Sequence, residues 1–158
     1  MVTNASNFNK EQSYKMLEYL DEIVFSIDFI DDVLNEKYGR GKNHFNHISE
    51  VIKNIKCYYP KCFIGINTVV MRPNLTHIEE IYNHINSLEI NEWKLIQFCS
   101  FRGMARENSD SFFITEREFN DVQEKYKSLS NFLQIESHTA KEMQLNHIVI
   151  TPSGKFTK

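Results

Sequence analysis

The chain has 158 residues, enough for one domain that buries a hydrophobic core without disulfides or structural metals. Its formal net charge is −3 at pH 7 and it contains no basic run, so the charge pattern gives no support for nucleic-acid binding. No apolar stretch reaches the roughly 20 residues that span a bilayer, and no signal peptide is visible. Three cysteines without metal-ligand spacing favour a reduced, cytoplasmic protein.

Four segments read as β-strands, and a helical segment separates each strand from the next. The strands are residues 2–4, 23–28, 63–70 and 93–98. This order predicts parallel strands whose carboxyl ends share one edge, where ligands bind in α/β folds. The sequence therefore predicts an α/β protein with its site at that edge.

Caps and apolar spacing mark the helices between and after these strands. Asn9 is the expected N-cap of the first helix, and a second helix is expected over 43–58. Thr76 with Glu79, and Thr115 with Glu118, have the spacing of capping boxes that open two further helices. The tail from residue 133 reads as mixed structure that ends in a strand at 147–150 and a turn at 152–154.

Polar residues interrupt one face of successive strands, or follow their ends, although buried parallel strands are usually apolar on both faces. We expect these residues to line a polar ligand site. An alternative is that Ser26 and Asp28 only cap the next segment while the Lys94 ammonium reaches water, and the pattern alone leaves both open. The candidate residues are Asn4, Ser26, Asp28, Asn67 and Lys94.

Five short motifs follow one another along the chain in an order that resembles a known family. They are Thr3-Asn4-Ala5-Ser6, Ser26-Ile27-Asp28, Gly39-Arg40-Gly41, Ile66-Asn67-Thr68-Val69-Val70 and Trp93-Lys94-Leu95-Ile96-Gln97-Phe98. Their order and spacing resemble viperin-like proteins of the radical S-adenosylmethionine (radical SAM) superfamily. Residues 112–119 resemble the segment that follows the sixth strand in that family, so the resemblance covers essentially the whole chain.

The resemblance implies a partial (β/α) barrel of the radical SAM type, of which this chain supplies about strands three to six plus a C-terminal extension. We expect a single domain over 1–158, with β/α repeats at 1–104 and the extension at 105–158.

The resemblance also implies roles for individual residues. Ser26 and Arg40 would hold the carboxylate of S-adenosylmethionine and Asn67 its ribose, with Asn4 as a further cofactor-binding residue. A guanidinium pairs bidentately with a carboxylate, and an amide serves a hydroxyl as donor or acceptor. Lys94 and Asp28 are the candidates for substrate binding. Without the resemblance, Arg40 reads as a solvated loop charge between two turn glycines.

The family's chemistry depends on a C-x-x-x-C-x-x-C loop that holds a [4Fe–4S] cluster, and this sequence contains no such loop. Cys57, Cys62 and Cys99 cannot reproduce it, so we expect no cluster, no metal site and no radical chemistry from this chain alone. The expected identity is the C-terminal portion of a radical SAM Fe–S oxidoreductase, either a truncation or a fragment. S-adenosylmethionine would then bind weakly, and no catalytic residue is assigned.

The expected ligand and partners are less defined. The resemblance to viperin-like proteins implies a nucleoside triphosphate bound through basic residues, one of which Lys94 matches. Gly65 and Glu92 stand where two other basic residues are expected, which argues against a polyphosphate. An alternative function is a nucleotide-like ligand-binding or accessory module without redox chemistry. A third is a metal-free hydrolase that uses Asp28 with His44 or His47. An unpaired edge at the N-terminal strand predicts a homo-oligomer.

Overall fold

The computed structural model describes residues 1–6, 8, 12–100, 109–129, 133–146, 149–150 and 156–157. Its elements, in chain order, are β1 (Val2–Thr3), α1 (Gln12–Leu17), β2 (Glu22–Ser26), α2 (Asp32–Lys37), α3 (His44–Tyr58), β3 (Phe63–Val70), the 3-10 turn η1 (Arg72–Asn74), α4 (Ile78–Ser87), β4 (Glu92–Gln97), α6 (Ser109–Phe112), α7 (Glu116–Lys127), β5 (Gln134–His138), α8 (Ala140–Asn146), β6 (Val149–Ile150) and β7 (Phe156–Thr157).

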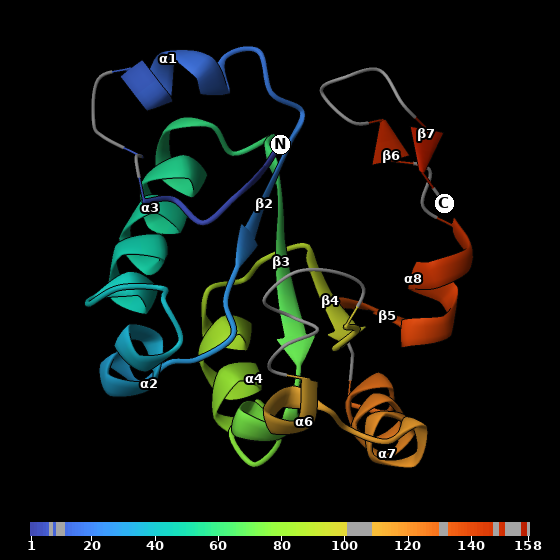
Figure 1. The fold of residues 1–158 in the computed structure, drawn as a ribbon. Helices are drawn as coiled ribbons and strands as arrows, with labels where there is room; N and C mark the ends of the chain where they lie inside the picture. The colour runs from blue at the N-terminus through green and yellow to red at the C-terminus, as the bar shows by residue number, and fades with distance from the viewer. Residues whose placement is uncertain are drawn as a thin grey trace.

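Five strands form one parallel sheet in the order β1-β2-β3-β4-β5 (Figure 1). The expected α/β class with parallel strands is therefore confirmed. β6 and β7 pair separately as a two-stranded antiparallel unit. In the described residues, no helix combines the length and the hydrophobicity required to cross a lipid bilayer.

Helices α3, α4 and α7 pack against one face of the sheet because each carries an apolar stripe. Ile52, Ile81 and Phe119, one from each helix, are fully buried in a core that also contains alternate residues of β2, β3 and β4. The inward residues are those that the alternation predicts, Ile23, Phe25, Ile64, Ile66, Trp93 and Leu95. The opposite face carries the polar residues Ser26, Asn67 and Lys94 together with apolar residues such as Val69 and Ile96.

Trp93 lies at the centre of this core and is fully buried. Its indole nitrogen Nε1 donates a hydrogen bond to Thr68 Oγ1 at 2.9 Å, and that hydroxyl donates to the carbonyl oxygen of Ile27 at 2.7 Å. The chain of hydrogen bonds satisfies both buried polar side chains and links β4, β3 and the end of β2.

The two expected capping boxes have different outcomes. Thr115 does cap α7, since its hydroxyl accepts from the backbone N–H of Glu118 at 3.2 Å and the Glu118 carboxylate accepts from the N–H of Thr115 at 2.9 Å. The prediction of a capping box at Thr76 was wrong. The N–H of His77 donates to the carbonyl of Asn74 at 2.8 Å, which keeps the backbone in turns, and α4 begins only at Ile78 without a side-chain cap.

The sequence did not predict α2 or β5. β5 has the sequence Gln-Ile-Glu-Ser-His, which is too polar and too short to read as a buried strand, yet it pairs in parallel with β4 over five residues. The expected strand at 147–150 is described only at Val149–Ile150. Asn9, residues 147–148 and the expected turn at 152–154 lie outside the described residues.

Candidate functional site

Three of the expected site residues form one row across the polar face of the sheet. Ser26 is the register partner of Asn67, and Asn67 is the partner of Lys94, on the adjacent strands β2, β3 and β4. All three side chains are partly exposed. Alternation along strands explains the row, because residues of the same parity point to the same face.

A hollow of about 1100 Å³ lies at the carboxyl end of the sheet, immediately beyond this row. Val69 and Ile96, which follow Asn67 and Lys94 by two residues on the same face, line it. Its lining also includes Asn4, Asp28 and Arg40. The topology thus brings three expected site residues to the hollow and places the row of the other three next to it.

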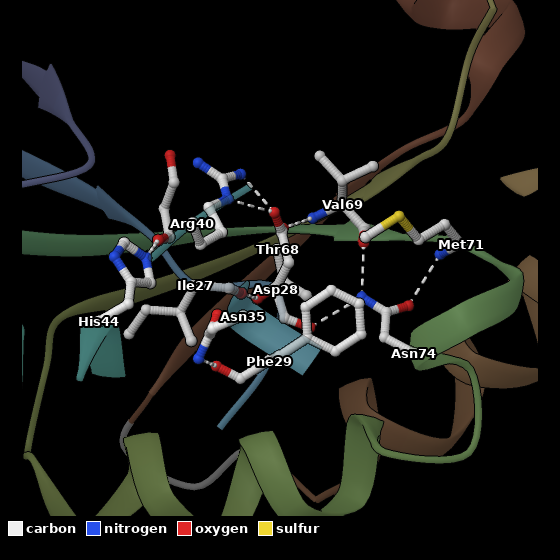
Figure 2. Close-up of polar contacts among 11 residues, drawn as sticks. Ile27, Asp28, Phe29, Asn35, Arg40, His44, Thr68, Val69, Met71 and Asn74 are labelled. Carbon is white, nitrogen blue, oxygen red and sulfur yellow. Dashed lines mark hydrogen bonds and ion pairs between the residues drawn. The ribbon is translucent and has the colours of Figure 1, made fainter. Parts of the chain in front are cut away.

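An ion pair between Arg40 and Asp28 is the main polar contact of the hollow (Figure 2). Asp28 is 4% exposed, and its Oδ2 accepts from Arg40 Nε at 3.0 Å and from Nη2. Its Oδ1 accepts from the backbone N–H of Val69 at 2.9 Å. Both oxygens of this buried carboxylate therefore have donors, as a buried charge requires.

The loop after α2 presents Arg40 to the hollow. Gly39 and Gly41 flank the arginine with φ of 79° and 86°, a region that favours glycine, so the chain can reverse at this point. The backbone N–H of Arg40 donates to the carbonyl of Asn35 at 2.8 Å. The Gly-Arg-Gly sequence is thus a helix-terminating turn that aims one guanidinium at the carboxyl edge.

The two histidines of the hydrolase alternative are engaged with backbone. His44 is buried and its Nε2 donates to the carbonyl oxygen of Ser26 at 3.0 Å. His47 Nε2 donates to the carbonyl oxygen of Ala5 at 3.0 Å. Burial is the main cause that lowers the pKa of His44, which favours its neutral form. In this arrangement both rings tie α3 to the sheet edge, and the geometry gives no support for a base next to Asp28.

Lys94 belongs to a charged network on the polar face. Its Nζ lies 3.2 Å from Glu136 Oε2 and 3.4 Å from Glu92 Oε2. Burial opposes the charge of Lys94, but the hydrogen bonds and charges of the two carboxylates outweigh it and raise its pKa. The Lys94 ammonium in turn lowers the pKa of Glu136. One ammonium thus faces two carboxylates, of which only Glu92 was noted from the sequence.

Gly65 lies beside the Glu92 carboxylate of this network. The two residues are register partners, and a Cβ at Gly65 would lie 3.7 Å from Glu92 Oε2 and 3.3 Å from Val24 Cγ2. A side chain at position 65 would therefore press on Val24 and lie in van der Waals contact with the Glu92 carboxylate. Gly65 and Glu92, the two departures from the expected basic residues, are therefore direct neighbours on β3 and β4.

Aromatic side chains form a wall of the hollow that the sequence did not indicate. Tyr38 stacks on Phe29 with ring centroids 5.0 Å apart, and Phe112 of α6 contacts Tyr38 at 5.7 Å and Phe98 at 5.4 Å. α6 contacts η1, which follows β3 directly, so it stands at the carboxyl end of the sheet (Figure 1). These rings come from segments far apart in sequence, and no local pattern could have grouped them.

The cysteines do not converge. Cys57 is exposed near the end of α3, Cys62 is buried just before β3, and Cys99 follows β4 at the opposite end of the sheet. Burial raises the pKa of the Cys62 thiol, which disfavours a thiolate ligand. In the described part of the chain, no three His, Cys, Asp or Glu residues are grouped to hold a metal ion. The residues present do not fit a [4Fe–4S] cluster.

The sheet matches part of a radical SAM fold. A crystal structure of Streptococcus suis SuiB bound to S-adenosylmethionine superposes with a TM-score of 0.59 and 14% identity, over 87% of this chain and 32% of that one. A second structure of SuiB gives the same TM-score at 16% identity. At these identities the comparison establishes the fold alone.

Sequence relatives define the relationship further, although no family model matches the chain. An S-adenosylmethionine-dependent nucleotide dehydratase of Flammeovirga pacifica is 31% identical over 160 residues, which cover 99% of this chain and 53% of that protein. A protein with the same description from Oncorhynchus mykiss is 29% identical over 82% of this chain and 38% of its own length. The chain is therefore related to these dehydratases, and the resemblance to viperin-like radical SAM proteins is confirmed. It spans about half the length of the Flammeovirga relative.

Proposed function

We propose that this chain carries a binding site for S-adenosylmethionine at the carboxyl end of a partial radical SAM barrel, with β1 to β4 in the places of barrel strands three to six. The observation that supports the proposal best is the position of Arg40, a partly buried guanidinium held beside the hollow next to the Ser26–Asn67 pair. In this site Arg40 and Ser26 bind the methionine carboxylate, Asn67 binds the ribose, and Asn4 lines the same hollow.

The chemistry of these donors fits the cosubstrate. A carboxylate needs a cation and further donors, a ribose needs groups that donate and accept, and the aromatic wall of Tyr38 and Phe112 suits a flat ring. The residues of this chain do not fit an iron–sulfur cluster in the same way, since the three cysteines lie at opposite ends of the sheet. We therefore assign no redox step to this chain. By itself, the chain acts as a binding protein in this proposal.

Replacing Arg40 by alanine should weaken S-adenosylmethionine binding about tenfold or more, because a charge-assisted hydrogen bond to a carboxylate contributes on the order of 1.5–3 kcal/mol. Isothermal titration of the wild type and of Arg40→Ala measures this. The wild-type affinity should itself be weak, since no cluster is present to coordinate the methionine group.

Lys42 provides the matched control, because it is an exposed cation two residues from Arg40 in the same loop. Lys42→Ala should leave the affinity unchanged. Micromolar binding that survives Arg40→Ala, or equal losses in the two variants, would place the cosubstrate elsewhere.

A binding or accessory module for a nucleotide-like ligand is the second candidate, and the Lys94 network favours a ligand without a polyphosphate. Lys94 remains the candidate for substrate contact, whereas Asp28, the other expected candidate, has both carboxylate oxygens bonded within the protein. However, two carboxylates within 3.4 Å of the Lys94 ammonium leave the polar face with a surplus of negative charge. A polyphosphate would be repelled there more strongly than a ligand with a single negative charge, and a neutral ligand would not be repelled.

We also propose that the chain forms a homo-oligomer through β1. In the described sheet β1 pairs with β2 only, and Val2 is 66% exposed. Open strand edges pair with strands of other chains, and charged residues on the edge prevent such pairing.

Light scattering should report at least two chains per particle, and Val2→Lys should give monomers. Val33→Lys, at a comparably exposed residue of α2, should leave the mass unchanged. A wild-type monomer at high concentration would contradict this assembly.

A further inference from the structure

Asp28 uses both carboxylate oxygens within the protein. Oδ1 accepts from the N–H of Val69 at 2.9 Å and Oδ2 accepts from two nitrogens of Arg40. Asp28 is 4% exposed, so water contributes little to its solvation. A ligand could displace these donors only by leaving a buried charge without a partner, which is costly. Asp28 is thus better placed to act on Arg40 than on a ligand.

Arg40 is held at both ends. Its backbone N–H donates to the carbonyl of Asn35, a residue that is fully buried and whose own amide nitrogen donates to the carbonyl of Phe29 at 3.2 Å. At the other end, Nε and Nη2 face Asp28 (Figure 2). The third guanidinium nitrogen, Nη1, is the one that remains for a ligand, and the side chain is 26% exposed beside the hollow.

We propose that Asp28 is a positioning residue that holds the Arg40 guanidinium beside the hollow, with Nη1 presented to the anionic group of the ligand. The inference rests on the proposed function, because it takes Arg40 as the group that binds a carboxylate. An arginine that is free to rotate loses side-chain entropy when it binds. Fixing it beforehand removes that cost and so raises affinity.

The first test needs no ligand. In the NMR spectrum of the full chain, exchange of the Arg40 Nε proton with water should be at least about tenfold slower than that of the exposed Arg117, because Asp28 accepts its hydrogen bond. In Asp28→Asn, which keeps the size of the side chain and an oxygen for the Val69 N–H, the two rates should become similar. An Arg40 signal that Asp28→Asn leaves unchanged overturns the proposal.

The second test is a double-mutant cycle with S-adenosylmethionine as the probe. Asp28→Asn should weaken binding about tenfold, and the double variant with Arg40→Ala should bind no more weakly than Arg40→Ala alone. Additive losses would show that Asp28 contacts the ligand itself and would overturn the proposal. If the wild type does not bind the probe at all, the proposed function fails, and the exchange measurement alone decides whether Asp28 holds Arg40.

Two further variants separate positioning from general stability. Glu118→Gln alters a second arginine–carboxylate pair of the described residues, in which Arg72 Nη2 donates to Glu118 at 2.9 Å, and should change neither readout. Arg40→Lys keeps a cation against the buried Asp28 carboxylate. This variant should therefore fold even in the case that Asp28→Asn does not fold. The single nitrogen of the substituted side chain cannot occupy both the Nη2 position against Asp28 and the Nη1 position beside the hollow, so the affinity of Arg40→Lys for S-adenosylmethionine should fall below that of the wild type. Wild-type affinity in Arg40→Lys would overturn the proposal.

Discussion

Reconstitution of this chain with iron and sulfide under anaerobic conditions should leave no bound iron–sulfur cluster. Thiolates must converge on a cluster to hold it. Cys57 and Cys62 lie near the amino ends of the strands, whereas Cys99 lies beyond the carboxyl end of β4. We expect less than stoichiometric iron after desalting and no visible absorbance of the kind that iron–sulfur proteins show.

The cysteine-free variant is the control for this measurement. Iron that remains after Cys57, Cys62 and Cys99 are all replaced by serine is adventitious. Stoichiometric iron in the wild type that disappears when Cys99 alone is replaced would contradict the expectation, because it would show that this thiol can be a ligand.

Replacing Trp93 by alanine should lower the free energy of unfolding by about 3–5 kcal/mol, the usual cost of removing a large aromatic side chain from a core. Trp93 is fully buried, with the rings of Tyr82 and Tyr126 at 5.8 and 5.3 Å. Since small domains are stable by only about 5–15 kcal/mol, the variant would approach unfolding. Urea denaturation followed by circular dichroism measures the difference. Tryptophan fluorescence cannot be used, because Trp93 is the only tryptophan and the variant lacks it.

Two comparison variants show which part of Trp93 matters. Trp93→Phe keeps a ring but removes the donor to Thr68, and should cost about 1–3 kcal/mol. Tyr58→Ala, at an aromatic residue that is 70% exposed, should change stability by no more than about 0.5 kcal/mol. A Trp93→Ala variant as stable as Tyr58→Ala would mean that the core is not packed around the indole.

The parts of the fold that local pattern determines were predictable from the sequence. The positions of Ile23 and Phe25, which alternate with Val24 and Ser26, identified the core-facing side of β2, because side chains of a strand alternate between its two faces. The same reasoning placed Ser26 and Asn67 on the opposite face, and the register of β2 and β3 then makes them partners. The assigned ligand roles of these residues remain predictions.

Features that depend on long-range contacts could not be predicted in this way. Arg40 and Asp28 are each readable as a polar loop residue, and only the turn after α2 brings their side chains together. Phe112 reaches Tyr38 through tertiary packing alone. Glu136 belongs to β5, whose polar sequence does not read as a buried strand. The second carboxylate beside Lys94 was therefore not predicted.

Asn74 joins the ends of β2 and β3 with one side chain. Its amide nitrogen donates to the carbonyls of Asp28 at 3.0 Å and Val69 at 2.8 Å, and its oxygen accepts from the N–H of Met71 at 2.9 Å (Figure 2). Separating these strand ends would break the bond to Asp28 and leave its buried backbone carbonyl without a partner. A ligand that enters the hollow therefore meets a stiff wall on the β2–β3 side. Any closure around it has to come from the opposite wall, where Phe112 is carried by the four-residue helix α6.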